Sequence, residues 1–275
     1  MQYDTVKQLQ DAQLKILKYA DSVCGNLGIN YYMLFGSLLG TIRHKGSIPW
    51  DFDIDIGLLR EDYEIFASYL KKHNLENGFF LDDYSTDPNH FSPHILLRDT
   101  STHLKLKNFG NILPKYDGIY IDIFPIDEVP RDKNARVKQG NNIEFLKKIV
   151  SYKRCVIQPG ESSKVKIIAK HIVQMILAPI SFRSLNRRID EIMKQFSGCN
   201  SGYRAICTDY PGAVNQAVDF SVYGIPSRMT YEDCTVLVPC GWDMLLQKWY
   251  GDYMKLPPED ERGVFFEKLF DSVQF

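Results

Sequence analysis

The sequence predicts an α/β (α+β) protein, with a mixed β-sheet and flanking helices followed by a mostly helical second part. Between residues 1 and 130, short apolar segments of strand length alternate with segments whose apolar side chains recur at helical spacing. Between 131 and 196, helical spacing prevails. We therefore expect a core at 1–130, a basic helical insert at 131–219, and a C-terminal segment at 220–275 that packs back on the core.

The elements follow from these spacings in chain order. Residues 5–24 place apolar side chains on one helix face, and two glycines then end the helix. Strands are expected at 29–35, 52–58, 79–81, 95–98 and 119–124, with helices at 38–45 and 62–73. In the second half, helices are expected at 133–150, 163–178, 185–196 and 242–250, with a short strand at 235–238.

Composition and charge narrow the class of protein. The chain has 275 residues, of which 44% are apolar and 24% charged, an ordinary globular balance. Residues 131–194 carry fifteen Lys/Arg and five Asp/Glu, whereas the remainder carries 18 and 29. This asymmetry indicates a polyanionic partner, an anionic membrane surface or an internal charge match. No stacking motif accompanies the basic segment, so we expect no nucleic-acid partner.

Targeting signals are not apparent in the sequence. The first residues lack the basic start and apolar run of a secretory signal, and no stretch of about 18 apolar residues follows. The chain is therefore expected in the cytoplasm, or peripherally at the inner face of the membrane. Six cysteines without a metal-binding spacing are expected to be reduced thiols; they are Cys24, Cys155, Cys199, Cys207, Cys234 and Cys240.

The segment 164–180 has a basic start and a strongly apolar end. Such a helix can lie on an anionic membrane surface, where lipid-linked glycans are found. The alternative is a helix buried in the core of the second half, and we favour that alternative.

Three aspartates alternate with apolar side chains in the segment 50–56. In a strand, Asp51, Asp53 and Asp55 would share one side while the apolar residues pack into the core. A row of carboxylates requires a cation or a proton, and hard oxygen ligands suit Mg²⁺ or Mn²⁺. The alternative is a solvated acidic edge strand. Asp51 is expected to matter less than the other two because it begins the strand.

Two further features raise the probability of a metal and phosphate site. Gly36 and Ser37 lie between an expected strand and a helical turn, where backbone N–H groups attract phosphate. Asp122 interrupts an apolar strand, where an ionised group is costly unless it is paired or metal-bound. The alternatives are an ordinary turn and an edge aspartate.

These features together resemble the LicD family, which has the nucleotidyltransferase fold. The resemblance covers the segment 34–66, which is long and specific, and the shorter segments 122–127 and 249–258. One position departs from the family pattern, because Phe52 stands where a third consecutive acid is usual. Phe52 is expected to face away from the neighbouring aspartates, so no metal ligand should be lost.

The resemblance implies transfer of phosphocholine, or a related alcohol phosphate, from a CDP-activated donor to a sugar hydroxyl of a cell-surface glycan, with release of CMP. Asp53, Asp55 and Asp122 would hold Mg²⁺ (or Mn²⁺), and Asp122 could instead accept the hydroxyl proton. The donor and acceptor contacts are expected to come from Gly36, Ser37, Arg43, His44, Asp51 and Arg98. The acceptor could be lipid-linked.

A choline head group would need an aromatic or acidic cage. The candidates for this cage are Trp50, Trp242, Trp249, Tyr250 and Tyr253. His90 and His94 are interpreted as loop or core residues rather than ligands. The rival functions are a metal-dependent glycosyltransferase, a small-molecule nucleotidyltransferase that uses ATP, and a non-catalytic nucleotide-binding scaffold.

Overall fold

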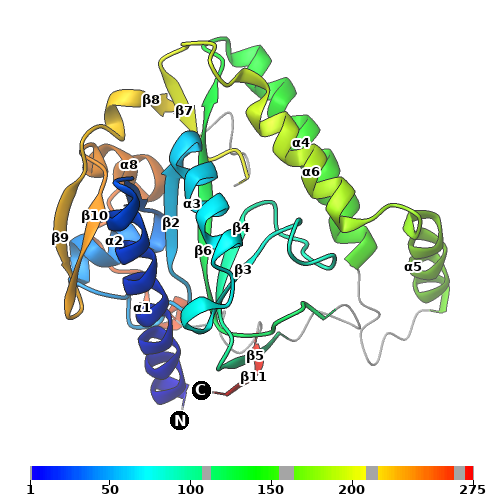
Figure 1. Cartoon of the computed structure of the whole chain (residues 1–275), viewed down its shortest axis with the longest axis horizontal. Coiled ribbons are helices and arrows are strands. Elements are labelled where there is room, and N and C mark those ends of the chain that lie inside the picture. Colours follow the sequence, from blue (N-terminus) through cyan, green and yellow to red (C-terminus); the bar gives the residue numbers. More distant parts are fainter. Residues whose placement is uncertain (1, 107–112, 155–163, 209–215, 263–269, 275) are drawn as a thin grey trace.

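A mixed β-sheet forms the centre of the molecule (Figure 1). In the computed structural model, residues 2–106, 113–154, 164–208, 216–262 and 270–274 are described. The sheet has the strand order β1-β2-β6-β4-β3, in which β2 and β6 run parallel and the other neighbours antiparallel. The predicted α/β class with a mixed sheet is therefore confirmed. The strands are β1 (Tyr31–Met33), β2 (Asp55–Leu59), β3 (Phe79–Asp82), β4 (Ile95–Asp99) and β6 (Tyr120–Val129).

The two faces of this sheet differ in polarity. Residues paired on neighbouring strands point to the same face, and Ile56 pairs with Ile123, which pairs with Ile95. All three side chains are at most 1% exposed. Helices α1 (Gln2–Leu27) and α3 (Arg60–Lys72) pack on the sheet. The opposite face carries the register pair of Asp55 and Asp122.

Three element boundaries differ from the sequence prediction. Helix α2 (Phe35–His44) begins before the Gly36-Ser37 pair, so these residues form its first turn rather than a break before it. Strand β2 begins only at Asp55, although the Ile54 carbonyl oxygen already accepts a hydrogen bond from the Asp122 N–H of β6 at 2.9 Å. Strand β6 continues through Pro125 to Val129. Proline is tolerated there because the register leaves 124–126 between the segments that pair with β4 and β7.

The helical part has its own small apolar core. Helix α4 (Lys133–Arg154) packs against α6 (Phe182–Met193), and β7 (Tyr203–Ala205) pairs with the end of β6. Helix α5 (Lys164–Leu177) packs on α4 and lies far from the sheet in Figure 1. The buried apolar cluster that this part of the chain forms consists of Val129, Ile143, Val150, Phe182, Leu185, Ile189, Ile192, Met193, Ala205 and Cys207.

A buried ion pair joins this part to the sheet. Arg60 contacts both carboxylate oxygens of Asp127 at 2.6 and 2.9 Å, and a carboxylate oxygen of Asp190 on α6 at 2.9 Å. Asp127 is completely buried. Breaking one partner of such a pair is costly, so Arg60 holds α6 in place against β6.

The C-terminal segment contributes to the main core. The hairpin β9 (Ser227–Tyr231) and β10 (Cys234–Val238) and helix α8 (Trp242–Tyr250) pack near β1 and α2. The boundaries at 130 and 219 remain predictions. Sequence reasoning missed several short elements: η1 (Glu76–Gly78), β5 (His103–Leu106), β7, β8 (Val218–Asp219), η3 (Phe220–Val222), β9, η4 (Glu259–Glu261) and β11 (Phe270–Gln274), which pairs with β5. The predicted helix 185–196 includes η2 (Lys194–Phe196).

Within the described residues, no helix combines the length and the apolar character that crossing a membrane requires. Five cysteines of this part are free thiols, as predicted. Cys155 lies outside the described residues.

Candidate active site

Carboxylates from two neighbouring strands come together on the polar face of the sheet. Asp55, the first residue of β2, pairs in parallel register with Asp122 of β6. Paired residues on adjacent strands lie roughly 5 Å apart and project to the same side. Asp55 is 9% exposed and the Asp122 side chain 17%. The predicted meeting of acids from two separate strands is therefore present in the fold.

Asp51 and Asp53 join this pair from the segment that precedes β2. The prediction that one strand aligns all three aspartates is wrong, because β2 starts only at Asp55. A side-chain hydrogen bond nevertheless links Asp51 to Asp53. Burial raises the pKa of Asp53 well above its usual range, and the negative charges of Asp51 and Asp122 raise it further. Burial also raises the pKa of Asp51. That Asp51 matters less than Asp53 and Asp55 remains a prediction.

Two glutamines of α1 hold this segment in place, and sequence reasoning missed both. The Gln10 amide donates to the carbonyl oxygens of Ile48 and Asp51 at 3.0 and 2.8 Å. The Gln13 amide donates to the carbonyl oxygens of Phe52 and Tyr120 at 2.9 and 3.1 Å. Buried glutamines on an otherwise apolar helix face were the available sequence signal. Gln13 thus ties the acidic segment to β6.

Replacement of Gln13 by leucine is expected to lower both stability and activity. The change leaves two carbonyl acceptors without their donor, at a cost of about 1–3 kcal/mol in unfolding free energy. Urea denaturation measures this loss, and Gln8→Leu provides the control because Gln8 is exposed on the same helix. Equal stability of the two variants would show that Gln13 does not hold the segment.

The start of α2 forms the second side of the site. The Ser37 hydroxyl is buried and accepts a hydrogen bond from the Asp55 backbone N–H at 2.9 Å, which joins α2 to β2. The helix has no side-chain N-cap and no acid in its first turn, so its N-terminal N–H groups favour an anion. Phe35 has a φ of 43°, which turns the chain sharply from β1 into the helix. Phe35 packs against Phe124 and Trp249, and these contacts offset the cost of its conformation.

Gly36 leaves room for the carboxylate of Asp51. A Cβ atom at position 36 would lie 2.5 Å from an Asp51 carboxylate oxygen. Gly36→Ala is therefore expected to displace Asp51 and to lower catalytic activity by roughly 10- to 100-fold, because small displacements in such sites are costly. Gly25→Ala in α1 is the matched control, since a Cβ there meets nothing within 4 Å. Steady-state kinetics on both variants measure the effect; full activity in Gly36→Ala would contradict it.

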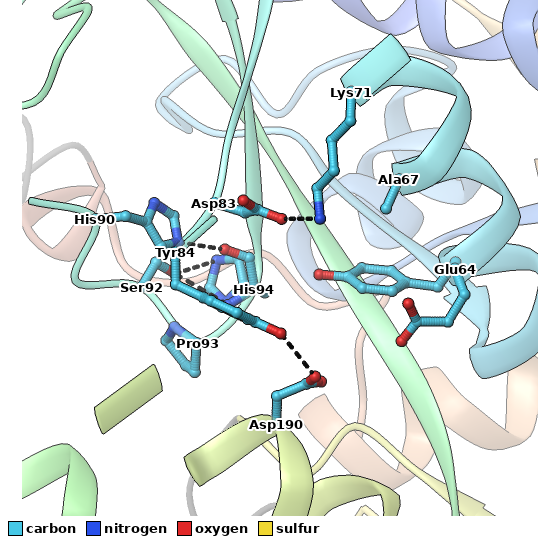
Figure 2. A pocket seen from close by; sticks show the side chains of 11 residues that line it. Glu64, Ala67, Lys71, Asp83, Tyr84, His90, Ser92, Pro93, His94 and Asp190 are labelled. Carbon is cyan, nitrogen blue, oxygen red and sulfur yellow. Dashed lines mark hydrogen bonds and ion pairs between the residues drawn. The ribbon is translucent and has the colours of Figure 1, made fainter. Parts of the chain in front are cut away.

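His94 contacts the acidic cluster directly. Its Nε2 lies 2.7 Å from an Asp122 carboxylate oxygen, and its ring packs on Phe124 with 4.1 Å between centroids. His94 also lines a polar pocket together with Tyr84 and Asp190, whose side chains are hydrogen-bonded (Figure 2). Its interpretation as a loop or core residue is therefore incomplete. A histidine immediately before a strand that faces an acidic strand was the available signal.

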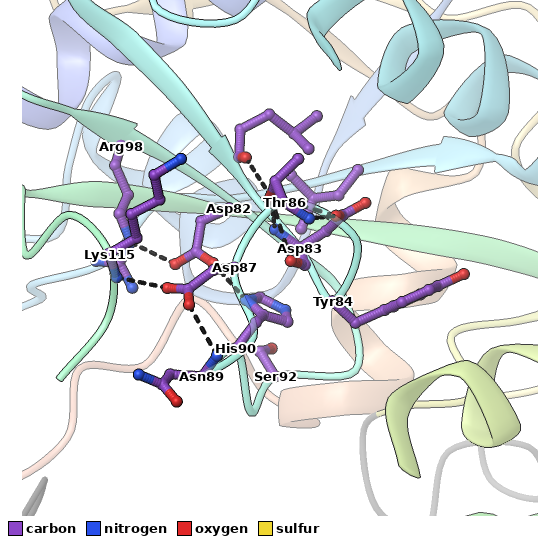
Figure 3. Close-up of polar contacts among 12 residues, drawn as sticks. Asp82, Asp83, Tyr84, Thr86, Asp87, Asn89, His90, Ser92, Arg98 and Lys115 are labelled. Atoms are coloured by element: carbon purple, nitrogen blue, oxygen red, sulfur yellow. Dashed lines mark hydrogen bonds and ion pairs between the residues drawn. The ribbon is translucent and has the colours of Figure 1, made fainter. Parts of the chain in front are cut away.

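The loop that precedes β4 is held by a dense polar network (Figure 3). Asp82 accepts hydrogen bonds from His90 at 2.7 Å and from Arg98 at 2.6 Å. His90 in turn contacts the His94 carbonyl oxygen at 3.0 Å. Arg98 is 3% exposed and also donates to the Gly118 carbonyl oxygen, so its predicted contact with substrate is not supported. Arg98 therefore stabilises the loop that carries His94.

Arg43 and His44 lie at the far end of α2 from Gly36 and Ser37. Arg43 donates to the Tyr253 carbonyl oxygen at 2.7 Å and so anchors the segment after α8. Burial lowers the pKa of His44, and the neighbouring Arg43 lowers it further. Both residues follow Gly36 and Ser37 by about two turns of the helix, roughly 10 Å along its axis, and their contact with phosphate remains a prediction.

The aromatic residues predicted as a choline cage are distributed among several contacts. Trp50 lies beside His44 and carries the Arg262 guanidinium over its ring at 5.1 Å. The Tyr253 hydroxyl donates to Asp243. Trp249 contacts Phe35 and Tyr250, which places it next to the start of α2; Trp242 packs at the edge of the main core.

The chemistry of the acidic cluster fits a divalent cation. All its potential ligands are carboxylate oxygens, which Mg²⁺ and Mn²⁺ prefer. Burial raises the pKa of both Asp51 and Asp53, and the negative charges of Asp51 and Asp122 add to the rise at Asp53, so a cation in the cluster would stabilise the ionised carboxylates. Among the described residues, no three His, Cys, Asp or Glu side chains are already spaced to hold a metal. Ligation by Asp53, Asp55 and Asp122 would therefore require rotation of side chains, and it remains a prediction.

A mixed sheet with paired aspartates beside a Gly-Ser helix start defines a nucleotidyltransferase-type site. The family model described as LicD/FKTN/FKRP, nucleotidyltransferase domain, matches residues 28–166. The chain therefore belongs to the LicD family, and the predicted family and transferase class are confirmed.

Two relatives show how far this similarity extends. The lipopolysaccharide cholinephosphotransferase LicD of Haemophilus influenzae is 26% identical over 267 residues, covering 94% of both chains. The human ribitol 5-phosphate transferase FKRP is 44% identical over 45 residues, which is 16% of this chain and 9% of that protein. The similarity to the bacterial enzyme thus includes the helical part and the C-terminal segment.

Proposed function

We propose that this protein transfers phosphocholine, or a related alcohol phosphate, from a CDP-activated donor to a hydroxyl group of a glycan and releases CMP. The observation that carries the proposal is the parallel pairing of Asp55 with Asp122 beside the Ser37 hydroxyl. The bacterial relative, similar over nearly the whole chain, is named for the transfer of phosphocholine in lipopolysaccharide. A ribitol phosphate donor is the second candidate, since FKRP shares a short segment.

In the proposed reaction, the oxygen of the acceptor hydroxyl attacks the phosphorus atom next to the alcohol. The bond between this phosphorus and the bridging oxygen breaks, and CMP leaves with that oxygen. Backbone N–H groups of Gly36 and Ser37 bind diphosphate oxygens. Asp122 either completes the metal site or accepts the hydroxyl proton, and in both roles His94 orients its carboxylate through the 2.7 Å contact.

Mg²⁺ or Mn²⁺, held by Asp53, Asp55 and Asp122, would neutralise the diphosphate and stabilise the developing charge. The hydroxyl group of the acceptor glycan would approach Asp122 beside His94. The acceptor could be lipid-linked, as in the assembly of cell-surface glycans.

The proposal is tested with purified protein, Mg²⁺ and a panel of donors. Thermal stabilisation is measured first with CDP-choline, CDP-ribitol, CDP-glycerol, UDP-sugars and ATP, because a ligand that binds only the folded state raises its stability. CMP release is then followed with the donors that bind. Metal-dependent CMP release from CDP-choline or CDP-ribitol supports the proposal.

The rival functions give other outcomes in the same panel. Sugar transfer from a UDP-sugar would indicate a glycosyltransferase, and AMP transfer from ATP a small-molecule nucleotidyltransferase. Nucleotide binding without turnover on any glycan acceptor would favour a scaffold. Each of these three results would overturn the proposed reaction.

A further inference from the structure

Helix α5 turns an apolar stripe towards solvent. Ile168, Ile172, Met175 and Ile176 are 58%, 46%, 71% and 68% exposed. Their spacing of four, three and one residues places them on one side of the helix. The prediction of a core helix is therefore wrong, and the apolar character of α5 needs another explanation.

The opposite side of α5 is the one that packs on the protein. Ile167, Val173 and Leu177 are less exposed than the stripe, and α5 contacts α4. The Lys153 ammonium on α4 donates to the Leu177 carbonyl oxygen at 3.1 Å and so fixes the C-terminal end of α5. An ordinary surface helix buries its apolar side and exposes its polar side. Helix α5 has apolar side chains on both sides. The exposed side therefore indicates contact with a second apolar environment, outside the protein.

The charge around α5 identifies that environment. Helix α5 contains three lysines and no Asp or Glu, whereas Arg188 of the neighbouring α6 pairs with Glu191. In α5 itself, Lys164, Lys166 and Lys170 are in the first half, whereas the exposed apolar side chains continue to its end. Basic residues next to an exposed apolar stripe are typical of helices that lie in the interface of an anionic membrane.

The place of α5 in the fold relates this surface to the active site. Arg154, the last residue of α4, lies over the Phe91 ring at 4.2 Å and interacts electrostatically with Tyr120. Tyr120 is two residues before Asp122 on the same face of β6. The C-terminal end of α4 therefore lies close to β6, and α5, which packs on α4 away from the sheet, is linked to the site through α4.

We propose that α5 binds the surface of an anionic phospholipid bilayer, with its apolar stripe among the acyl chains and the surrounding basic residues at the head groups. This inference goes beyond the proposed reaction and is independent of it. A membrane-bound α5 would hold the protein at the membrane surface, where lipid-linked acceptors are presented.

Co-sedimentation with vesicles tests the inference without any turnover. The wild-type chain is expected to bind vesicles of phosphatidylcholine with phosphatidylglycerol and to bind pure phosphatidylcholine more weakly. The double variant Met175→Glu/Ile176→Glu should lower the partition coefficient at least about tenfold, because two side chains no longer enter the acyl region. Ile225→Glu/Met244→Glu is the matched control, since these side chains are 90% and 58% exposed on other elements.

Three results would overturn the inference: wild-type protein that binds neither vesicle, an α5 variant that binds as well as the control, or a dimer in the absence of vesicles that the α5 variant abolishes. The dimer would show that a second copy covers the stripe. Transfer to a water-soluble acceptor should be the same in the wild type and in both variants, so a failure of vesicle binding is distinguishable from a failure of the proposed reaction.

Discussion

Replacement of Asp53 by asparagine is expected to abolish transfer and to stabilise the metal-free protein at neutral pH. Burial and the charges of Asp51 and Asp122 raise the folded-state pKa of Asp53 above its unfolded value. The wild type therefore loses stability as the pH rises from about 4 through that raised pKa. Asparagine has no charge, so the variant does not undergo this loss.

The activity of the Asp53→Asn variant should fall by roughly 10³-fold or more, as when a charge-stabilising group is removed from a preorganised site. Thermal unfolding in EDTA and with Mg²⁺ gives the second measurement: the metal should stabilise the wild type and have little effect on the variant. Asp233→Asn is the control, because Asp233 is an exposed partner of Lys18 far along the chain from the site. Retained turnover in Asp53→Asn would remove Asp53 from the mechanism.

Replacement of His94 by alanine is expected to lower kcat by about 10- to 100-fold and to raise the half-saturating Mg²⁺ concentration to a similar degree. The 2.7 Å contact with Asp122 fixes the orientation of a carboxylate that is predicted to bind the metal. Without that contact the carboxylate can rotate, and part of the binding free energy is used to hold it. The metal titration separates this effect from a loss of folding, because a merely unstable variant would keep its Mg²⁺ dependence.

Two further variants decide whether the hydrogen bond or the packing matters. His94→Phe keeps a ring against Phe124 but has no donor for Asp122, so it should be as impaired as His94→Ala. His103→Ala is the control, because His103 makes the same 2.7 Å contact with Asp117 while 59% of its side chain is exposed. A fully active His94→Phe variant would show that His94 acts only through packing.

The order of the main elements could be predicted from the sequence because it depends on local periodicity. Helix α3 and strands β3 and β4 have their expected positions within two residues. Prediction from the local pattern was wrong where strand pairing determines where an element begins. The alternation before Asp55 is typical of a strand, yet β2 begins only at Asp55. Five short strands were missed because two- to five-residue segments have little periodicity of their own.

The candidate site, too, could be predicted only in part from the sequence. The sequence by itself determined the chemical identity of the acids and of the Gly-Ser helix start, since residue type and spacing are enough to recognise them. Only the tertiary structure decided that His94 contacts Asp122, that Gln13 holds the acidic segment, and that Arg98 is occupied by the loop. These contacts join residues that are 16 to 39 positions apart in the chain. Such residues come into contact only when strands pair and helices pack on the sheet.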